Sequence, residues 1–458
     1  MYKKSIFIFR RDLRLSDNSS LIEALKQSET VLPCFFFDPR QYKENKFASD
    51  FALSFMVHSL KEVDQLLRKE GGRLYFFSGS PEQNLSKLID DFSADAVFLN
   101  YDYTPFSRKR DKSIRELCLK KEVEFRAFHD ALLFAPGKVL KDDGKPYTVY
   151  TPFMKKALKQ QVREPENFPA DPGFTTTLQT KLSQEHPLET FLAAPPENAF
   201  RTGGRSEAVK ILGNIASFKD YQDTRNIPAK SGTTGLSAHL KFGTVSAREV
   251  YYRVAEELGK DHLLIRELLW RDFFTHVCFY FPRVIGNAFK QKYDQIEWKE
   301  DKKNFSLWAE GSTGFPIVDA GMRELRATGY MHNRVRMIVA SFLVKDLHID
   351  WRWGEKHFAQ YLVDYDPAVN NGNWQWAAST GCDAQPYFRI FNPWLQQKKF
   401  DPETEYIKKW IPELRSIPAK AIHALVESRP SQLKDYPEPI VIHEEAREEA
   451  KEMFALDD

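Results

Sequence analysis

The first 130 residues alternate short apolar runs with helical stretches. Five runs of mainly apolar or aromatic residues lie at 5–9, 31–38, 73–79, 96–103 and 123–130. The segments between them, such as 54–71, carry apolar residues at the spacing of an amphipathic helix. Strands that alternate with helices in this way predict a parallel five-stranded sheet flanked by helices. We therefore expect an α/β N-terminal domain over residues 1–130.

The pattern changes after residue 130. Residues 131–205 are rich in proline, glycine, threonine and charge, as in FPADPGFTTTL, and this composition predicts an interdomain linker. Residues 206–458 show long segments with a period of about 3.6 residues and few strand signals, which predicts an all-helical C-terminal domain. The last residues, HEEAREEAKEMFALDD, read as a short charged helix.

Composition narrows the class of protein. The 458 residues suffice for two or three domains, and 42% hydrophobic with 28% charged residues is typical of a globular protein. Aromatic residues, at 14%, are frequent enough to favour an aromatic-lined cavity. The formal net charge is only +2, so a polyanion would have to bind at a local basic patch.

Cysteine usage and hydropathy indicate an intracellular protein. The four cysteines are far apart and form no C-x-x-C pair, which favours reduced, mostly buried thiols and no metal site. The N-terminus has too short an apolar run for a signal peptide, and no segment approaches the roughly 18 apolar residues of a membrane span. We expect a cytoplasmic protein without a membrane contact. Neither a G-x-G-x-x-G fingerprint nor a P-loop follows the first predicted strand, so a ligand of this half would bind in another way.

One predicted helix, LIRELLWRDFF (264–274), carries a mixed polar and aromatic face. Glu267, Trp270, Arg271 and Phe274 follow one another at i, i+3, i+4 and i+7 and so share a face. A solvated Glu-Arg pair beside a partly buried tryptophan would explain this face without any function. The alternative is a cavity wall on which the indole stacks a flat ligand and the charges orient it.

A second predicted helix, MHNRVRMIVASFLVKDL (331–347), has an apolar stripe that faces the core. Asn333, Arg336 and Met337 lie on another face. A methionine at such a place is usually a gap filler. An asparagine beside two arginines suits a phosphate or the edge of a flavin.

The segment DYDPAVNNGNWQW (364–376) offers two carboxylates and two indoles. Asp364 and Asp366 lack a third ligand near them in sequence, so they are better read as acceptors for a ribose or a ring N–H, with Arg336 as a partner that keeps one of them charged. If a helix begins after an Asn-Gly turn here, Trp374 and Trp376 point about 200° apart and serve different sides. Core packing alone would also account for the two indoles.

A run of small and hydroxyl residues, SGTTGLSAHL (231–240), precedes another predicted helix. Free backbone N–H groups at a helix start can hold a phosphate. The signal is weak alone, because serine and threonine cap helices of all kinds.

Together these segments resemble the DNA photolyase/cryptochrome family, and within it the class I cyclobutane pyrimidine dimer photolyases. The residues that carry the resemblance are FRRDLRLSDN (9–18), TTGLSAHLKFG (233–243), RELLWRDFF (266–274), 308–347 and NNGNWQWAASTGCDAQPYFRIFNP (370–393). The resemblance spans nearly the whole chain. It implies an α/β antenna domain followed by a helical domain that holds FAD.

The resemblance also implies a set of cofactor residues. Asn370 matches the asparagine that faces flavin N5, and Arg336 matches the partner of the first aspartate. The family often has tryptophan where this chain has Leu264, so that contact departs from the family pattern. The FAD-binding positions carried over are Tyr221, Thr233, Thr234, Gly235, Leu236, Ser237, Arg271, Asn333, Arg336, Asp364, Asp366 and Asn370.

For the substrate, the resemblance implies double- or single-stranded DNA that carries a pyrimidine dimer, repaired by an electron from light-excited reduced FAD. The matches for the flipped dimer are Glu267, Trp270, Asn333, Met337 and Trp376. Arg225 and Arg334 match contacts to the DNA backbone, and Trp374, Trp351 and Trp298 match an electron relay toward the surface. We expect the protein to act as a monomer.

Two other branches of the family are alternatives. The (6-4) photolyases use a pair of histidines where this chain reads MHNRVRM, which favours dimer repair. Cryptochrome photoreceptors usually signal through long C-terminal extensions, and this chain stops soon after EEAREEAKEMF. We therefore expect a deoxyribodipyrimidine photo-lyase, with a blue-light photoreceptor as the non-enzymatic alternative.

The prediction of which antenna chromophore the protein binds depends on few residues. Folate-type members carry Asn-Glu where this chain has Phe106 and Ser107. Asp102 and Lys241 resemble positions that contact a deazaflavin in other members, which favours 8-hydroxy-5-deazaflavin. FMN, methenyltetrahydrofolate or no antenna are the alternatives, and the two residues would then be surface charges.

Overall fold

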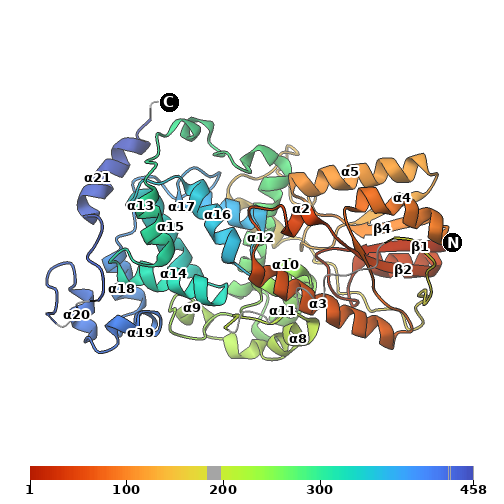
Figure 1. Ribbon diagram of the computed structural model, residues 1–458, viewed down its shortest axis with the longest axis horizontal. Helices are drawn as coiled ribbons and strands as arrows, with labels where there is room; N and C mark the ends of the chain where they lie inside the picture. Colours follow the sequence, from red (N-terminus) through yellow and green to blue (C-terminus); the bar gives the residue numbers. More distant parts are fainter. Residues whose placement is uncertain (183–197, 432, 434, 457–458) are drawn as a thin grey trace. The chain divides into compact units, whose positions relative to one another are not determined.

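The predicted parallel sheet is present. The computed structural model describes residues 1–182, 198–431, 433 and 435–456 (Figure 1). The strands are β1 (Tyr2–Phe9), β2 (Ser28–Phe37), β3 (Tyr75–Ser78), β4 (Ala96–Asn100) and β5 (Glu124–Phe128). All pairings are parallel and the strand order is β3-β2-β1-β4-β5, so the expected α/β class is confirmed.

Strands β1, β2 and β4 are buried on both faces over most of their length, as the inner strands of a parallel sheet require, whereas the edge strand β5 is only partly buried. Ile6 and Ile8 pack with residues of helices α4 (Pro81–Phe92) and α5 (Pro105–Lys120). Phe7 and Phe9 point to the opposite face because side chains alternate along a strand, and their rings lie 4.6 Å apart. This double burial explains why the strands read as nearly continuous apolar runs. The other helices of this part of the chain are α1 (Ser19–Gln27), α2 (Pro39–Tyr42), α3 (Asp50–Lys69) and α6 (Tyr150–Ala157).

The chain after residue 200 is helical, as predicted. Helices α8 to α12 span Arg205–Gly213, Tyr221–Thr224, Ser237–Phe242, Ala247–Leu258 and Leu263–Tyr280. Helices α13 to α17 span Lys302–Glu310, Pro316–Thr328, Asn333–Lys345, Trp351–Tyr361 and Pro367–Ala377. Helices α18 to α21 span Pro393–Phe400, Glu405–Trp410, Ala419–His423 and His443–Phe454, and single 3-10 turns lie at 215–218, 282–284, 291–295 and 412–414. No helix in the described residues combines the length and apolarity needed to cross a membrane.

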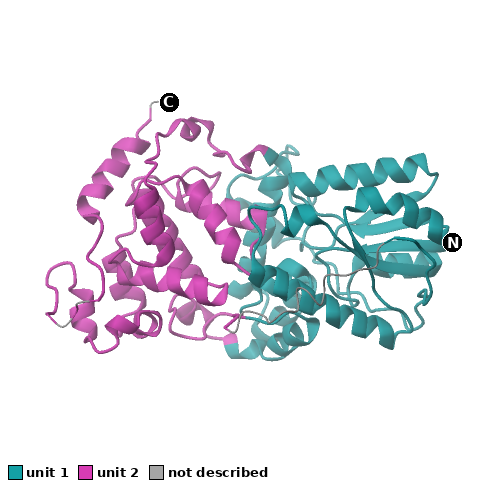
Figure 2. Cartoon of the chain, in the orientation of Figure 1, with its two compact units in different colours: residues 1–197, 201–217, 235–282 teal, residues 198–200, 218–234, 283–458 magenta. Residues whose placement is uncertain are grey.

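By contacts, the chain divides into two compact units (Figure 2). Unit 1 contains residues 1–197, 201–217 and 235–282, and unit 2 contains 198–200, 218–234 and 283–458. This division rests on contacts between residues, whereas the limits predicted at residues 130 and 205 rest on the sequence pattern. The predicted domain limits therefore stay a prediction. Part of the predicted linker, 183–197, lies outside the described residues.

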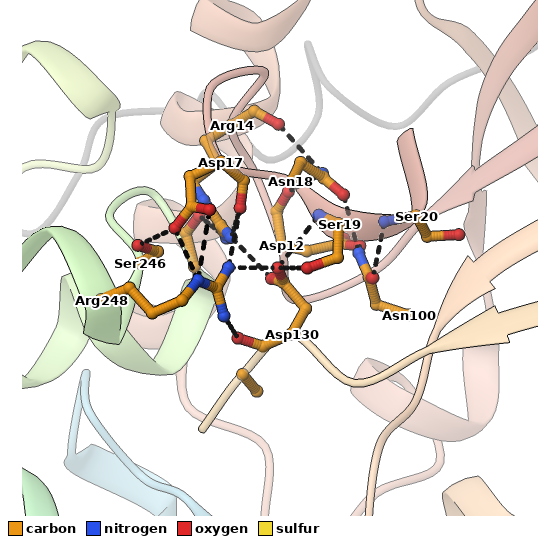
Figure 3. A network of polar contacts seen from close by, with 12 residues as sticks. Asp12, Arg14, Asp17, Asn18, Ser19, Ser20, Asn100, Asp130, Ser246 and Arg248 are labelled. Carbon is orange, nitrogen blue, oxygen red and sulfur yellow. Dashed lines mark hydrogen bonds and ion pairs between the residues drawn. The ribbon is translucent and has the colours of Figure 1, made fainter. Parts of the chain in front are cut away.

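A buried charge cluster joins distant segments of unit 1 (Figure 3). The Arg248 guanidinium on α11 donates to Asp17 after β1 at 2.9 Å and to Asp130 after β5 at 2.8 Å. Arg14 also donates to Asp130, at 2.6 Å, and the Ser246 hydroxyl donates to Asp17. Burial opposes ionisation of Asp130, but the two arginines outweigh it and hold its pKa well below the usual range. We call these four residues, Arg14, Asp17, Asp130 and Arg248, the charge junction.

The aromatic core of unit 2 centres on Trp308 and Trp374, which are buried with the apolar stripe of α15. The stripe comprises Met331, Val335, Ile338, Val339, Phe342 and Leu343, all nearly inaccessible as the periodicity predicts. The expected Asn-Gly turn before the two tryptophans is wrong. Residues 370–372 lie inside α17, because Asp366 caps the helix and Pro367 starts it earlier.

Candidate active site

The predicted site residues fall in both units, and each set is described by itself. In unit 1, α12 carries the polar and aromatic face expected from its sequence. Trp270 is partly buried and stacks on Tyr150 of α6, with ring centroids 3.5 Å apart and planes 8° from parallel. Glu267 precedes it on the same face and is also partly buried. The α12 face therefore presents an indole held by another ring, with a carboxyl group one turn away.

Polar groups of α12 also bind the segment that follows β5. Arg271 donates to the Ala131 carbonyl at 2.6 Å. Asp272 accepts the Phe134 N–H at 2.9 Å, and the His276 ring contacts the Phe134 carbonyl at 2.8 Å. Burial lowers the pKa of His276 to about 4, so the neutral ring donates. These contacts hold the backbone of residues 131–134 against the helix that carries Trp270.

Asp272 was not expected from the sequence. Its side chain is inaccessible, and burial raises its pKa to about 7 against the opposing effects of Arg271 and the Phe134 N–H. The sequence feature that could have indicated a buried aspartate is the position of Asp272 on the apolar face of α12. Sequence periodicity cannot tell such a group from a solvated one, because its partners are more than 130 residues away.

The predicted phosphate run changes units along its length. Thr233 and Thr234 belong to unit 2, and Gly235, Leu236 and Ser237 belong to unit 1, where Ser237 starts α10. Gly235 has a positive φ of 66°, which a side chain rarely tolerates. In unit 2 the Thr233 side chain hydrogen-bonds the Tyr330 hydroxyl. The run is therefore a tight turn that leads into a short helix.

In unit 2 the expected pairing of Arg336 with Asp364 is present. The guanidinium donates two hydrogen bonds to the carboxylate at 2.9 and 3.1 Å and a third to the Met331 carbonyl at 2.7 Å. Asp364 is only 4% exposed at its side chain, so the bidentate pair holds a buried carboxylate in place. Asn333, one turn before Met337 on α15, places its amide nitrogen 3.9 Å from that sulfur.

Helix α17 supplies the other predicted FAD residues. Asp366 accepts the N–H groups of Ala368 and Val369 at 3.0 and 3.3 Å, so its carboxylate is a helix cap. Asn370 donates to the Glu355 carboxylate at 3.1 Å, and Tyr365 donates to the same oxygen. Burial raises the pKa of Glu355. Glu355 was missed by sequence reasoning, although it orients the carboxamide of Asn370.

The predicted DNA-backbone arginines are both in unit 2. Arg225 ends α9, which begins with the buried Tyr221, and its guanidinium lies 5.4 Å from the centre of the Tyr221 ring. Arg334 on α15 donates to Asn226 at 2.8 Å and lies over the Phe400 ring. Both cations are thus held near aromatic rings.

The predicted relay tryptophans differ in their surroundings. Trp374 is 2% exposed and its ring contacts are with Phe358 at 4.9 Å and Trp308 at 6.3 Å. Trp351 is also buried, with the Arg352 guanidinium 4.9 Å from its ring centre. Trp298 is partly buried against Phe454, 5.7 Å away. Trp376 is partly exposed, so the two indoles of α17 lie in different surroundings.

The two predicted antenna residues share a neighbour in unit 1. The Arg11 guanidinium lies 3.5 Å from the Asp102 carboxylate, and its Nε donates to the Lys241 carbonyl at 3.2 Å. Asp102 also accepts from the Ser107 hydroxyl at 3.1 Å. A side chain at Gly243 would strike the Arg11 carbonyl, 2.4 Å away, so the glycine permits this close approach. Arg11 thus lies between the Asp102 carboxylate and the Lys241 backbone, while the Lys241 amine lies 3.8 Å from the centre of the Phe242 ring.

The chain is similar to known proteins over nearly its whole length. Residues 5–172 match the family described as DNA photolyase, and residues 264–456 match the family described as the FAD binding domain of DNA photolyase. The chain is 39% identical to the deoxyribodipyrimidine photo-lyase of Alkalihalophilus pseudofirmus, with 98% of this chain and 97% of that protein covered.

Two solved structures are similar over nearly their whole length. The photolyase of Sulfolobus tokodaii, solved with two FAD molecules, is 44% identical with a TM-score of 0.89, covering 98% of this chain and 99% of that one. The Synechocystis cryptochrome is 29% identical with a TM-score of 0.90, covering 98% and 99%. On the family matches, the full-length identity and the shared fold, the chain belongs to the DNA photolyase family.

Proposed function

We propose that the protein is a deoxyribodipyrimidine photo-lyase that repairs cyclobutane pyrimidine dimers in DNA with light. The observation that carries this proposal is the α12 face. There the Trp270 indole stacks on the Tyr150 ring, and Glu267 lies one helical turn before Trp270. A base that leaves the duplex needs a stacking surface and a hydrogen-bonding group at its edge. The indole and the carboxyl group meet these two needs.

The described residues suit FAD as the cofactor. When bound, reduced FAD would supply the electron that splits the dimer and would receive it back. In unit 2, the bidentate Arg336–Asp364 pair holds a buried carboxylate in place, and its oxygens can accept from a ring N–H. The Asn370 carboxamide, oriented by Glu355, can meet the polar edge of the flavin.

Other side chains would bind and orient the DNA. Trp270 and Trp376 each offer an indole to a flipped base, worth roughly 1–3 kcal/mol per base. Asn333 and Met337 share one face of α15 and would contact the dimer edge. Arg225 and Arg334 would neutralise phosphates, so we expect the affinity to fall as salt rises.

The experiment is a repair assay. The flavin-loaded, reduced protein is mixed with a thymine-dimer oligonucleotide, and the return of thymine absorbance is followed under blue light and in the dark. We expect light-dependent return, and Glu267→Ala should lower the quantum yield more than it lowers the flavin content. No light-dependent return by a flavin-loaded protein would contradict the proposal.

A photoreceptor is the second candidate, favoured by the similarity to the Synechocystis cryptochrome. If the protein is a photoreceptor, the same assay should show a light-dependent change in flavin absorbance and no return of thymine absorbance. A (6-4) photolyase is disfavoured because Asn333 and Met337 stand where that branch uses histidines.

For the antenna we propose 8-hydroxy-5-deazaflavin at the site around Arg11, which lies between the Asp102 carboxylate and the Lys241 backbone. The Sulfolobus tokodaii photolyase was solved with a second FAD, which makes FAD a competitor here beside FMN and methenyltetrahydrofolate. Extraction of the bound chromophores and their absorbance spectra decide among them. Asp102→Ala should lower the antenna content and leave one FAD per chain.

A further inference from the structure

Tyr150 is bound to the same turn of α12 that carries Trp270. Its ring covers one face of the indole, with centroids 3.5 Å apart. Its hydroxyl donates to the Arg266 carbonyl at 2.7 Å. Tyr150 is 7% exposed and begins α6. The ring and the hydroxyl together fix the position of Tyr150 relative to the indole.

The packing around this pair limits the movement of Trp270. The Phe273 ring lies 5.8 Å from both the Tyr150 and the Trp270 rings, edge-on to each. Phe274 lies 5.4 Å from Trp270. Phe153, one turn along α6, packs on Phe273 and His276 and so holds α6 to α12. The indole plane is therefore set by neighbours from two helices.

We propose that Tyr150 is a positioning residue that backs Trp270, so that a base can stack only on the opposite indole face. This rests on the proposed function, in which the base belongs to the flipped dimer. A ring that is already held in its binding orientation loses less side-chain entropy when the base arrives. Without Tyr150, the indole could turn or accept another group on the uncovered face.

The test compares Tyr150→Phe, which keeps the ring stack, with Tyr150→Leu, which removes it. Affinity for a thymine-dimer oligonucleotide is measured beside affinity for the undamaged oligonucleotide. We expect about a tenfold weaker dimer affinity for Tyr150→Leu, an unchanged affinity for undamaged DNA, and near wild-type behaviour for Tyr150→Phe. Phe153→Leu is the comparison variant: it loosens α6 but leaves the Tyr150 ring on the indole, so its dimer affinity should fall less than that of Tyr150→Leu.

A double-mutant cycle shows whether Tyr150 acts through Trp270. In a Trp270→Leu background, Tyr150→Leu should change the dimer affinity less than twofold; a full tenfold loss there would overturn the proposal. The near-ultraviolet circular dichroism of the DNA-free protein should change in Tyr150→Leu, and an unchanged indole signal would also overturn it. If Trp270→Leu alone binds the dimer normally, the stacking role in the proposed function is wrong, and the positioning role in binding is wrong with it.

A second observation concerns the buried rings of unit 2. The ring contacts of Trp374 continue to Trp308, and from Trp308 to Phe305 at 5.6 Å and on to the partly exposed Trp353 at 5.3 Å. The Trp308 indole N–H donates to the Val339 carbonyl at 3.2 Å. A carbonyl dipole at this place stabilises a positive charge on the indole.

Trp351, the relay position after Trp374, has a less favourable neighbour. The Arg352 guanidinium lies 4.9 Å from its ring centre, and a cation there opposes the removal of an electron from the ring. The Asp350 and Asp294 carboxylates pair with Arg352 and offset part of this effect.

We infer that a second electron path leaves Trp374 through Trp308 and ends at Trp353. It rests on the electron relay that the family resemblance predicts for this photolyase, in which Trp374 would supply one electron to the flavin. Trp308 then gives one electron to the Trp374 radical cation, and Trp353 gives one to Trp308. Trp353 releases its indole proton to water, and an external thiol returns one hydrogen atom to the neutral radical.

Variants in a Trp298→Phe background test this path, because the Trp298→Phe change removes the surface end of the predicted relay and leaves the second path as the route for electrons. Light-driven bleaching of the flavin with a thiol present should persist in Trp298→Phe and fall at least tenfold when Trp308→Phe or Trp353→Phe is added. The control is Trp394→Phe, which replaces a buried indole tilted against Phe315, and it should have no effect. Without thiol, mass spectrometry should find light-dependent oxidation of Trp353.

The outcomes distinguish the second electron path from the predicted relay through Trp351 and Trp298. Complete loss of bleaching in Trp298→Phe alone would overturn the second path and leave the predicted relay intact. Normal bleaching in Trp374→Phe would refute the predicted relay and the second path with it, and would leave the repair of dimers by reduced FAD untouched. Bleaching that survives Trp298→Phe but is unaffected by Trp308→Phe would overturn the second path alone.

Discussion

The two units bury different chemistry. Unit 1 contains the charge junction, where Asp17 and Asp130 pair with Arg14 and Arg248. Unit 2 contains an aromatic cluster in which Trp308, Trp374 and Phe358 contact one another edge-on or face-on. A buried charge depends on a few charged or hydrogen-bonding partners, whereas a packed ring depends on the shape of many neighbours. The charge junction should therefore be the more sensitive to loss of a single group.

The largest effect should come from Arg248→Met. This change leaves Asp17 and Asp130 buried with one partner fewer, and breaking such a pair costs about 3–5 kcal/mol of unfolding free energy. Denaturant titration of the full chain measures it. Arg253→Met on the same helix, where the arginine pairs with Glu256 and Glu257 near the surface, should cost below about 1 kcal/mol. Equal losses for the two variants would refute the special role of the charge junction.

A smaller effect is expected for Gly354→Ala in the aromatic cluster. The added methyl group would lie 2.1 Å from the Trp374 ring and 2.5 Å from Leu343, so it must displace the indole. Overpacking of this kind costs about 1–3 kcal/mol, less the gain in helix propensity. Gly213→Ala, where nothing lies within 4 Å, is the matched control and should be neutral or stabilising. A stabilised Gly354→Ala protein would show that the Trp374 ring can move away from the added methyl group at little cost in free energy.

The third comparison is the pH dependence of two buried aspartates of unit 1. Burial raises the pKa of Asp272 to about 7, so the folded protein takes up a proton there between pH 7 and about 4 while the unfolded chain does not. Lowering the pH through this range therefore stabilises the fold through Asp272. The pKa of Asp130 is depressed, so its contribution is present above about pH 4 and is lost only below that.

Asp272→Asn should remove the gain in unfolding free energy between pH 7 and 4, measured by thermal or denaturant unfolding at each pH. Asp261→Asn, at an exposed position just before α12, should keep the wild-type slope. An unchanged slope in Asp272→Asn would mean that this carboxyl group is ionised in the folded protein at neutral pH.

Much of the fold follows from local patterns. The five strands were predictable because each is a short apolar run between turn signals, and the α12 and α15 faces follow from helical spacing. The misplaced turn at 370–372 shows how a local signal can mislead. An Asn-Asn-Gly run suggests a turn, but Asp366 and Pro367 four residues earlier are a stronger helix start.

The partners of the site residues were less predictable. Glu355 holds Asn370 from another helix, and Tyr150 holds Trp270 across a separation of more than 100 residues. Trp308 was visible in the sequence as one of nine tryptophans, but nothing in its own segment indicates a contact with Trp374. Such contacts depend on packing between elements, which no local periodicity encodes.

The sequence by itself determined the element types, the apolar faces and, through its motifs, the family and the residue types available for flavin and DNA. These properties arise from backbone propensities and from periodic burial, which act over a few residues. Only the tertiary structure decided which groups become partners. Arg248 meets Asp17 across 231 residues, and together with the Ser246 hydroxyl and the Glu166 N–H it stabilises a buried carboxylate. Electrostatic and stacking energies depend on distance in space, so their effects appear once the chain is folded.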